Sequence, residues 1–367
     1  MLSTKNKIIY VFCQNMRVGR IAKTPQGPLA FEYDSAWLAD GYSISPFKLP
    51  LQKKVFVAPH SPFEGNFGVF NDSLPDGWGR LLIDRLLIKK GIRPAEVSTL
   101  DRLALVGTSG IGALEYQPEE TLGTSRPDTL ALGGLVKEIN ALLREREVPD
   151  ENLASLVRLG GSSGGARPKV FLKIDGEDWI VKFPARSDPK DIGRQEYRYS
   201  VLARQAGLEI PETRLLDGRY FAVKRFDRRD GGKVHILSAS GLLDASHRFP
   251  SLDYTDLLTA ALKLTRDYRE AEKMFRLMCF NVMAHNRDDH AKNFSFLFDG
   301  GRWLVSPAYD LTRSEGMGGE HATAIGGEGK NPAMKHILAV ADKVGLDPKR
   351  SKNILMSVED ALTYSHN

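Results

Sequence analysis

The segment Asn286-Arg287-Asp288-Asp289-His290-Ala291-Lys292-Asn293 decides how the rest of this 367-residue chain is interpreted. Within it, Asp288 and Asn293 stand in a D-x-x-x-x-N spacing, which phosphoryl-transfer enzymes use for a catalytic base and a magnesium ligand. The preceding stretch MFRLMCFNVMAH is apolar almost all round and predicts a buried helix that delivers the segment. The stretches FSFLF and RWLV follow, separated by DGG, and predict a β-hairpin. The sequence therefore predicts a catalytic loop between a buried helix and a hairpin.

Asp310 is the predicted second metal-binding residue. It ends the segment Ser306-Pro307-Ala308-Tyr309-Asp310, directly after the predicted hairpin. Because the DGG turn folds the chain back, the two ends of the hairpin are expected to lie together, and Asp310 is expected near Asn293. Taken singly, each carboxylate is more often a helix cap or a solvated loop residue. Their joint arrangement favours a site for phosphoryl transfer.

A Gly-rich run, Leu159-Gly160-Gly161-Ser162-Ser163-Gly164-Gly165-Ala166, is the candidate phosphate-covering loop. Glycine lets the backbone approach phosphates closely and present N–H groups to them, and we expect Gly164, Gly165 and Ala166 to contact a nucleotide. Lys182 follows in the strand WIVKFP, from which it could reach phosphates. Phosphorylation of Ser162 or Ser163 would place about −2 charge in the loop and block the cradle. A flexible linker and a surface lysine are the alternatives.

Glu196 is the candidate partner of Lys182. A helix is predicted from Ser187-Asp188-Pro189 to a stop at Gly207. Four of its residues recur at helical spacing: Ile192, Glu196, Tyr199 and Ala203. Glu196 therefore shares a face with apolar residues and needs a cationic partner, for which Lys182 is the natural candidate. Pairing with an arginine of the same helix is the alternative.

The order of predicted elements places a β-rich half before a helical half. Residues 1–125 are predicted to form an N-terminal subdomain, residues 126–228 a nucleotide-binding lobe with the Gly-rich loop, and residues 229–367 a helical catalytic lobe. The predicted class is α+β, with a two-lobed, protein-kinase-like fold. No phosphate loop of the GxxxxGK[ST] form occurs.

Composition is that of a globular protein, with 42% hydrophobic and 26% charged residues. No apolar run approaches the roughly 18 residues of a membrane span, so we expect a cytoplasmic location and no membrane partner. The chain has only two cysteines, Cys13 and Cys279, which lie far apart and are expected to be buried thiols. A net charge of +5 would help the chain approach a nucleic acid or an acidic partner without establishing either.

The motifs GGSSGGARPK, WIVKFP, AVKRFDR, NRDDHAKNFSF and SPAYDLT resemble, in order, those of the HipA family of serine/threonine kinases. This family supplies the toxins of type II toxin–antitoxin systems. The stretch VFNDSLPDGWGRLLIDR is similar to the family's N-terminal subdomain, so that the resemblance spans nearly the whole chain. One departure is HILSASGLLDASHRFPSLDYTDL, where many members carry a Gln-Glu-Asp-rich segment, which puts the substrate-side contacts in question.

The resemblance implies a role for each matching residue. It implies that Asp288 is the catalytic base, that Asn293 and Asp310 bind Mg²⁺, and that Lys182 contacts phosphate. The residues Lys224, Arg225 and Phe226 would form the adenine-binding hinge through main-chain groups. Ser162 would be the autophosphorylated serine, with Ser163 able to share that role.

The resemblance also implies cofactors and partners. ATP and Mg²⁺ are the implied cofactors. A small helix-turn-helix antitoxin similar to HipB is the implied partner, and it would link the kinase to operator DNA. The implied protein substrate is of the aminoacyl-tRNA synthetase class, although no residue of the sequence identifies it.

Two other functions compete with an active kinase. The residues His285, Asp288, Asp289 and His290 superficially resemble the metal cluster of a metal-dependent phosphohydrolase, but that function leaves the Gly-rich loop and Lys182 unexplained. The other competitor is a kinase-fold corepressor that binds an antitoxin on operator DNA with little activity. The intact set of Lys182, Asp288, Asn293 and Asp310 favours an active enzyme.

Overall fold

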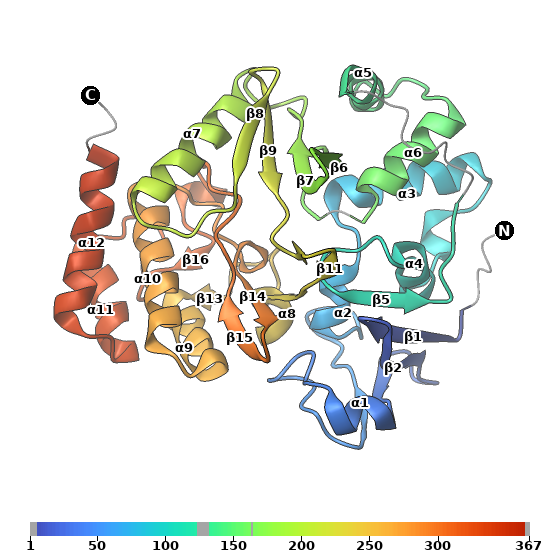
Figure 1. Cartoon of the computed structure of the whole chain (residues 1–367), viewed down its shortest axis with the longest axis horizontal. Helices are drawn as coiled ribbons and strands as arrows, with labels where there is room; N and C mark the ends of the chain where they lie inside the picture. Colours follow the sequence, from blue (N-terminus) through green and yellow to red (C-terminus); the bar gives the residue numbers. More distant parts are fainter. Residues whose placement is uncertain (1–5, 123–131, 163, 364–367) are drawn as a thin grey trace. The chain divides into compact units, whose positions relative to one another are not determined.

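The computed structural model describes residues 6–122, 132–162 and 164–363, and the chain divides into two compact units (Figure 1). Unit 1 comprises Met1–Ile44, Leu49–Gly193 and Arg214–His235, and unit 2 comprises Ser45–Lys48, Arg194–Thr213 and Ile236–Asn367. Sheets and helices together confirm the predicted α+β class. The predicted boundaries near residues 125 and 228 stay a prediction. Within the described residues, no helix is long and apolar enough to cross a membrane.

An antiparallel five-stranded sheet begins unit 1, in the order β4-β3-β2-β1-β5. Its strands are β1 (Ile8–Cys13), β2 (Met16–Lys23), β3 (Leu29–Tyr33), β4 (Val55–Val57) and β5 (Leu114–Gln117). Alternate residues such as Ile9, Val11 and Phe31 are buried, as strand geometry requires. The associated helices are α1 (Ser35–Asp40), α2 (Gly68–Ser73) and α4 (Thr99–Val106). Phe70 of α2 packs edge-on against Phe31, which places the core on that side of the sheet.

A second sheet in unit 1 carries the strands that precede the predicted nucleotide hinge, in the order β6-β7-β9-β8. Its strands are β6 (Lys169–Ile174), β7 (Glu177–Lys182), β8 (Thr213–Leu216) and β9 (Tyr220–Lys224). β6 and β7 form an antiparallel hairpin, with Lys169 opposite Lys182. Its two-residue turn has positive φ at Asp175 (53°) and Gly176 (80°), the conformation of a type I′ turn.

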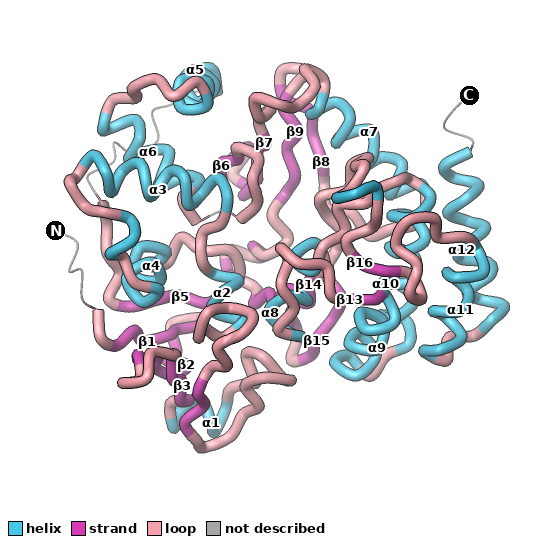
Figure 2. The backbone as a smooth tube through the Cα atoms, turned by 180° about the vertical axis from the view of Figure 1, so that it is seen from behind, coloured by secondary structure: helices cyan, strands magenta, loops and turns pink. Residues whose placement is uncertain are grey.

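Helices pack against the sheet β6-β7-β9-β8 and form a large apolar core with it. They are α3 (Gly77–Lys89), α5 (Leu132–Leu143) and α6 (Asp150–Gly160), with the short helix η1 (Pro94–Glu96), and Figure 2 shows α3 and α6 side by side. Trp78 and Leu82 of α3, Leu156 of α6 and Trp179 of β7 belong to this core. α3 ends at Lys89, and Gly91, two residues later, has φ +72°. The short pair β10 (Arg228–Arg229) and β11 (Gly232–Lys233) completes the unit.

Unit 2 is mainly helical. Its helices are α7 (Ile192–Gln205), which begins at the end of unit 1, α8 (Ala239–Leu243), α9 (Tyr254–Thr265), α10 (Tyr268–Met283), α11 (Met334–Val344) and α12 (Pro348–Thr363). Asp253 caps α9 in a capping box with Asp256, and Asp267 caps α10. α10 is the predicted buried helix, with Phe275, Met278 and Phe280 fully buried. It therefore delivers the following loop from a fixed interior position.

Short strands complete unit 2. β12 (His235–Ser238), β14 (Ser295–Asp299) and β15 (Arg302–Val305) form one sheet, and β13 (Leu252–Asp253) pairs in parallel with β16 (Thr323–Ala324). The remaining helices are the 3-10 turns η2 (Ala291–Asn293) and η3 (Met317–Gly319). β14 and β15 are the predicted hairpin, and its turn has positive φ at Gly300 (56°) and Gly301 (79°).

The predicted start of α7 is wrong by several residues. The helix begins at Ile192 because Asp188 accepts hydrogen bonds from the Ala185 N–H and from Arg167, and does not cap a helix. The predicted stop is confirmed at Gly207, where φ is +79° and the Leu208 N–H donates to the Ala203 carbonyl.

His235 gives unit 1 a testable acid sensitivity. Its side chain donates from Nε2 to the Ile44 carbonyl at 2.9 Å, and burial lowers the pKa of His235 from 6.5 to about 4. Unfolded chains bind a proton at this residue below pH 6.5, whereas the folded chain does not until about pH 4. Stability should therefore fall as the pH is lowered through this window, by about 3 kcal/mol at its lower end.

The measurement is denaturant unfolding of the wild type and of His235→Gln at several pH values from 7 to 4. Glutamine keeps a donor for Ile44 but does not titrate, so its stability should depend less on pH across this window. Equal pH dependence of the two proteins would contradict the assignment.

Candidate active site

The loop between α10 and η2 brings the Asn293 side chain against the backbone of Asp288. The Asn293 side chain donates from Nδ2 to the Asp288 carbonyl at 2.6 Å, which closes the loop across five residues. The Asp288 side chain is 65% exposed, and its Oδ1 lies 3.9 Å from Nε2 of His290. A carboxylate this exposed can meet a hydroxyl group of another molecule.

The segment that carries Asp310 lies against the same loop. The Ser306 N–H donates to the Ser295 carbonyl at 2.9 Å, so the two ends of the β14–β15 hairpin meet. One residue before Asp310, the Tyr309 hydroxyl donates to the Lys292 carbonyl at 2.7 Å and lies 2.6 Å from the Ser295 hydroxyl. Asp310 itself has φ +55°, an uncommon backbone conformation for a residue other than glycine.

Asn293 and Asp310 offer donor atoms that suit Mg²⁺. The amide nitrogen of Asn293 is used by Asp288, so Oδ1 is the atom it has for a metal ion. Asp310 contributes a carboxylate, and Mg²⁺ in nucleotide sites is typically held by one or two such groups together with phosphate oxygens and water. Among residues 6–122, 132–162 and 164–363, no three His, Cys, Asp or Glu side chains are grouped to hold a metal ion. The oxygen atoms of Asn293 and Asp310 therefore suit a metal ion whose other ligands come from a nucleotide and water.

Asp289, adjacent in the chain to Asp288, occupies the opposite environment. Its side chain is fully buried and hydrogen-bonded to Tyr254 and His321. Asp289 is thus committed to the interior of unit 2 and is separated in environment from the exposed Asp288. No local sequence pattern indicated these contacts of Asp289, because its partners lie more than thirty positions away along the chain.

In unit 1 the Gly-rich loop is anchored to the start of α3. The Trp78 N–H donates to the Gly165 carbonyl at 2.9 Å, and Nε1 of Trp78 donates to the Lys169 carbonyl at 3.0 Å. Gly165 has φ +81°, which explains why the loop needs glycine there. A Cβ atom at Gly77 would lie 2.3 Å from the Gly165 oxygen and 2.8 Å from Cα of Ala166. The stretch PDGWG thus sets the position of the loop, a role that local sequence patterns did not indicate.

Lys182 and Glu196 belong to different units, and their pairing stays a prediction. Lys182 ends β7, and its Nζ lies 5.5 Å from the centre of the Phe221 ring. Glu196 lies on α7 and is 4% exposed, with Ile192 and Ala203 also buried. The predicted apolar environment of Glu196 is therefore confirmed.

The predicted hinge from Lys224 to Phe226 begins at the last residue of β9. The Arg225 N–H donates to the Asp178 carbonyl at 2.8 Å, so the main-chain group that Arg225 can offer an adenine is its carbonyl. Its guanidinium group is buried, stacks over the Phe171 ring at 4.4 Å and binds Asp227 through two nitrogens. The amine of Lys224 lies 3.0 Å from Glu177. Arg225 therefore stiffens the hinge through its side chain.

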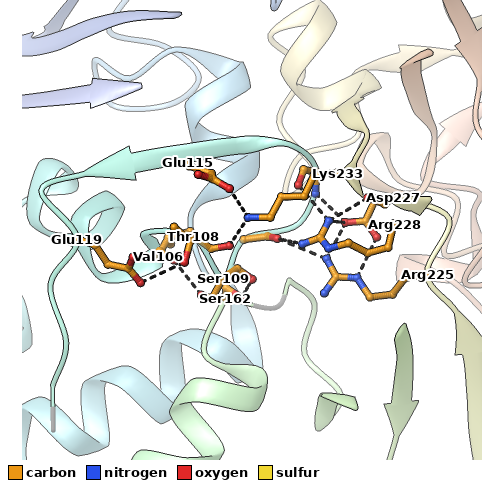
Figure 3. Close-up of polar contacts among 12 residues, drawn as sticks. Val106, Thr108, Ser109, Glu115, Glu119, Ser162, Arg225, Asp227, Arg228 and Lys233 are labelled. Carbon is orange, nitrogen blue, oxygen red and sulfur yellow. Dashed lines mark hydrogen bonds and ion pairs between the residues drawn. The ribbon is translucent and has the colours of Figure 1, made fainter. Parts of the chain in front are cut away.

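Asp227 holds the hinge against the loop of residues 108–112 (Figure 3). It is 3% exposed and accepts hydrogen bonds from Arg225, from Arg228 at 2.7 Å and from the Gly112 N–H at 2.8 Å. Burial alone would raise the pKa of Asp227, but these bonds and the two arginine charges outweigh burial and lower the pKa. Asp227 is therefore a charged anchor.

The same loop receives Ser162 from the Gly-rich run. Ser162 is 7% exposed, and its hydroxyl donates to the Ser109 carbonyl at 2.9 Å. Arg228 donates to the Gly110 carbonyl and Lys233 to the Thr108 carbonyl (Figure 3). Residues that follow the hinge therefore also bind this loop. The other candidate phosphoacceptor, Ser163, lies outside the described residues.

Family models match both parts of the chain. Residues 161–364 match the model described as the HipA-like C-terminal domain, and residues 9–117 match the HipA N-terminal domain. The chain belongs to the HipA family. The predicted family resemblance is thereby confirmed.

Individual HipA-family and kinase-named relatives are distant. The protein Y4mE of Sinorhizobium fredii, whose name describes it as a kinase, is 29% identical over 83% of this chain and 77% of its own length. The serine/threonine-protein kinase toxin HipA of Shewanella oneidensis is 24% identical over 77% of this chain and 69% of its own length. In a solved complex of Shewanella oneidensis HipA with HipB and operator DNA, the matched chain has a TM-score of 0.70 at 20% identity. The match covers 97% of this chain and 91% of that one. The fold is therefore the HipA fold.

The contact between Gly77 and Gly165 predicts a specific defect in nucleotide binding. In Gly77→Ala the added methyl group would collide with the Gly165 carbonyl, and its backbone at φ +41° would be strained. We expect unfolding free energy to fall by about 2–4 kcal/mol and affinity for ATP to fall with it. Denaturant unfolding and a nucleotide-binding titration measure the two effects.

The matched control is Gly91→Ala, at the other end of α3. Gly91 also has positive φ (+72°), but nothing lies within 4 Å of its added Cβ. This variant should lose only about 1–2 kcal/mol and bind ATP as the wild type does. The same loss of ATP affinity in both variants would contradict a role for the Gly77 contact.

Proposed function

We propose that this chain is an ATP- and Mg²⁺-dependent serine/threonine protein kinase and the toxin of a toxin–antitoxin pair. The observation that carries the proposal is the closed loop in which Asn293 binds the Asp288 carbonyl beside the Tyr309–Asp310 segment. Membership of the HipA family supports it, as does the name of the Shewanella oneidensis relative. In this proposal the exposed Asp288 would serve as the base, and Asn293 and Asp310 would supply oxygen ligands.

In the proposed reaction, Asp288 accepts the proton of a serine or threonine hydroxyl as its oxygen attacks the γ-phosphorus of ATP. The bond from that phosphorus to the β,γ-bridging oxygen breaks, and ADP leaves. Asn293 and Asp310 would hold Mg²⁺, which would neutralise phosphate charge. Lys182 would contact the phosphates, and the Gly-rich loop at Gly164, Gly165 and Ala166 would cover them.

The partners follow from the same proposal. The Shewanella oneidensis protein was solved in complex with HipB and operator DNA. We propose that this chain likewise binds a helix-turn-helix antitoxin and reaches operator DNA through it. Its protein substrate would be of the aminoacyl-tRNA synthetase class, and it would phosphorylate its own Gly-rich loop.

Removing the proposed base should abolish transfer. In Asp288→Asn the side chain keeps its size but cannot accept a proton, so the rate of labelling should fall roughly 10²- to 10⁴-fold. Purified protein is incubated with γ-labelled ATP and Mg²⁺, and the phosphate incorporated into the chain is measured over time. The phosphorylated residue is then mapped.

Asp342→Asn is the matched control, since Asp342 is an exposed carboxylate on α11. It should label as fast as the wild type. Equal rates of labelling for the wild type and Asp288→Asn would contradict the kinase proposal.

Ser162 is the residue through which we propose that the Gly-rich loop is regulated. In the structure its hydroxyl donates to the Ser109 carbonyl from a buried position. A phosphorylated serine has lost that hydrogen, and its two negative charges would face a carbonyl oxygen in a site shielded from water. The phosphorylated loop therefore cannot return to this position, and we propose that phosphorylation suppresses nucleotide binding.

Phosphorylated protein should bind ATP roughly tenfold or more weakly than Ser162→Ala/Ser163→Ala, which cannot be phosphorylated in the loop. Isothermal titration of the two samples with ATP and Mg²⁺ measures the difference. The single variants Ser162→Ala and Ser163→Ala show which serine is responsible. If the phosphorylated sample bound ATP as tightly as the double variant, the regulatory proposal would fail.

A further inference from the structure

A hydrogen-bonded cluster lies beside the catalytic loop of unit 2, and the proposed reaction uses none of its side chains. Its centre is Asp289, whose side chain is 0% exposed, next to the 65%-exposed side chain of Asp288. A buried carboxylate is strongly unfavourable unless its oxygens are paired. The chain therefore supplies a complete set of donors for Asp289, and those donors come from distant segments.

Each carboxylate oxygen of Asp289 accepts from two donors. Oδ2 lies 2.8 Å from the Tyr254 hydroxyl and 2.8 Å from Nδ1 of His321, which carries a hydrogen because a carboxylate only accepts. Oδ1 accepts the Ala322 N–H at 2.8 Å and the Thr323 N–H at 3.4 Å. His321 is itself buried, with 2% of its side chain exposed. The carboxylate is thus fully satisfied without water.

The segment of residues 321–323 also binds the backbone on both sides of Asp288. Thr323 donates from its hydroxyl to the Asp289 carbonyl at 2.6 Å. The Ala322 N–H, in addition to its bond with the Asp289 side chain, lies 3.2 Å from the Arg287 carbonyl and donates to it. The residues immediately before and after Asp288 are therefore held by one distant segment, which β16 fixes by pairing with β13.

Tyr254 continues the cluster to the helix that precedes the loop. Its hydroxyl accepts a hydrogen bond from Nδ2 of Asn281 at 2.9 Å, and Oδ1 of Asn281 accepts one from Nδ2 of Asn286 at 2.9 Å. A second bond joins the Asn286 N–H to the Asn281 carbonyl at 2.8 Å. Hydrogen bonds thus hold the start of the loop against α10. Tyr254 and Asp289 extend this hydrogen-bond network to His321.

We propose that Asp289, with His321 and Tyr254, is the positioning device of the catalytic loop and holds the backbone that aims the Asp288 side chain at the substrate hydroxyl. This inference rests on the proposed kinase function. Neither Asp289 nor His321 touches the reacting atoms; they act through the backbone of residues 287–289. A displacement of about 1 Å at a catalytic group can lower a rate about 10²-fold, so loosening this cluster is expected to affect turnover.

The test compares His321→Leu with His321→Asn. Leucine removes the donor to Asp289, whereas asparagine can place its Nδ2 near the position of the histidine Nδ1. Steady-state labelling of a peptide or protein substrate, with the concentration of folded protein set by nucleotide titration, gives kcat and KM for ATP. We expect His321→Leu to lower kcat roughly 10- to 100-fold with KM for ATP unchanged, and His321→Asn to restore kcat to within a few-fold.

The control for simple loss of stability is Leu355→Ala, which opens a cavity at a buried position on α12. It should lower Tm, as His321→Leu should, but leave kcat per folded molecule unchanged. If His321→Leu lowers Tm with no change in kcat per folded molecule, or if His321→Asn fails to restore kcat, the positioning role is overturned.

Tyr254→Phe serves as the second variant in case His321→Leu does not fold, because it removes one oxygen atom from the cluster. It is expected to lower kcat in the same way, and an unchanged kcat would overturn the inference. Failure of the proposed function gives a different result, since wild-type protein would then transfer no phosphate at all.

Discussion

A carboxylate buried away from water has to be completely paired, and this constraint organises the catalytic loop of unit 2. Asp289 is buried beside the exposed Asp288, so the chain changes from interior to surface within one residue. That change is possible only because Tyr254, His321 and two backbone N–H groups converge on the buried side chain. The exposed Asp288, which is the proposed base, and the buried Asp289 therefore depend on the same set of contacts.

Unit 1 meets the same constraint with different chemistry. Its buried carboxylate, Asp227, is paired with the guanidinium groups of Arg225 and Arg228, and these charges keep its pKa low. Removing one partner of such a buried pair typically costs 3–5 kcal/mol, because a buried charge is left uncompensated. These charges lie together on the hinge side, and they reach the loop of residues 108–112 through the Gly112 N–H and the Gly110 carbonyl. The Asp289 cluster instead uses a hydroxyl, an imidazole and main-chain donors.

Much of the local structure could be predicted from the sequence because its causes are local. The turns Asp175-Gly176 and Gly300-Gly301 favour hairpins through positive φ, and the apolar run before Asn286 is a buried helix. The D-x-x-x-x-N spacing also marked Asp288 and Asn293 as members of one loop, in which the Asn293 side chain donates to the Asp288 carbonyl. In each case a short pattern contains the whole physical reason.

The contacts that position these local elements could not be predicted, because they join segments far apart in the chain. Gly77 packs against Gly165, which lies almost ninety positions away in the chain. The residues next to either glycine do not indicate which backbone segment it will contact. His321 likewise follows a Gly-rich stretch without periodicity, so no pattern marked it as the partner of Asp289. The start of α7 was misplaced for a related reason, because Asp188 found a tertiary partner in Arg167.

The two loops of the proposed site differ in how firmly they are held, and that difference bears on regulation. The loop that carries Asp288 is fixed by the buried Asp289 side chain with its four donors, and removing one of them leaves a buried oxygen atom with fewer hydrogen bonds. The Gly-rich loop is held by single neutral hydrogen bonds, such as Trp78 to Gly165 and Ser162 to Ser109, each typically contributing about 1 kcal/mol. In the proposed regulation, a single phosphate on Ser162 would therefore release the Gly-rich loop, while the loop that carries Asp288 would stay in place.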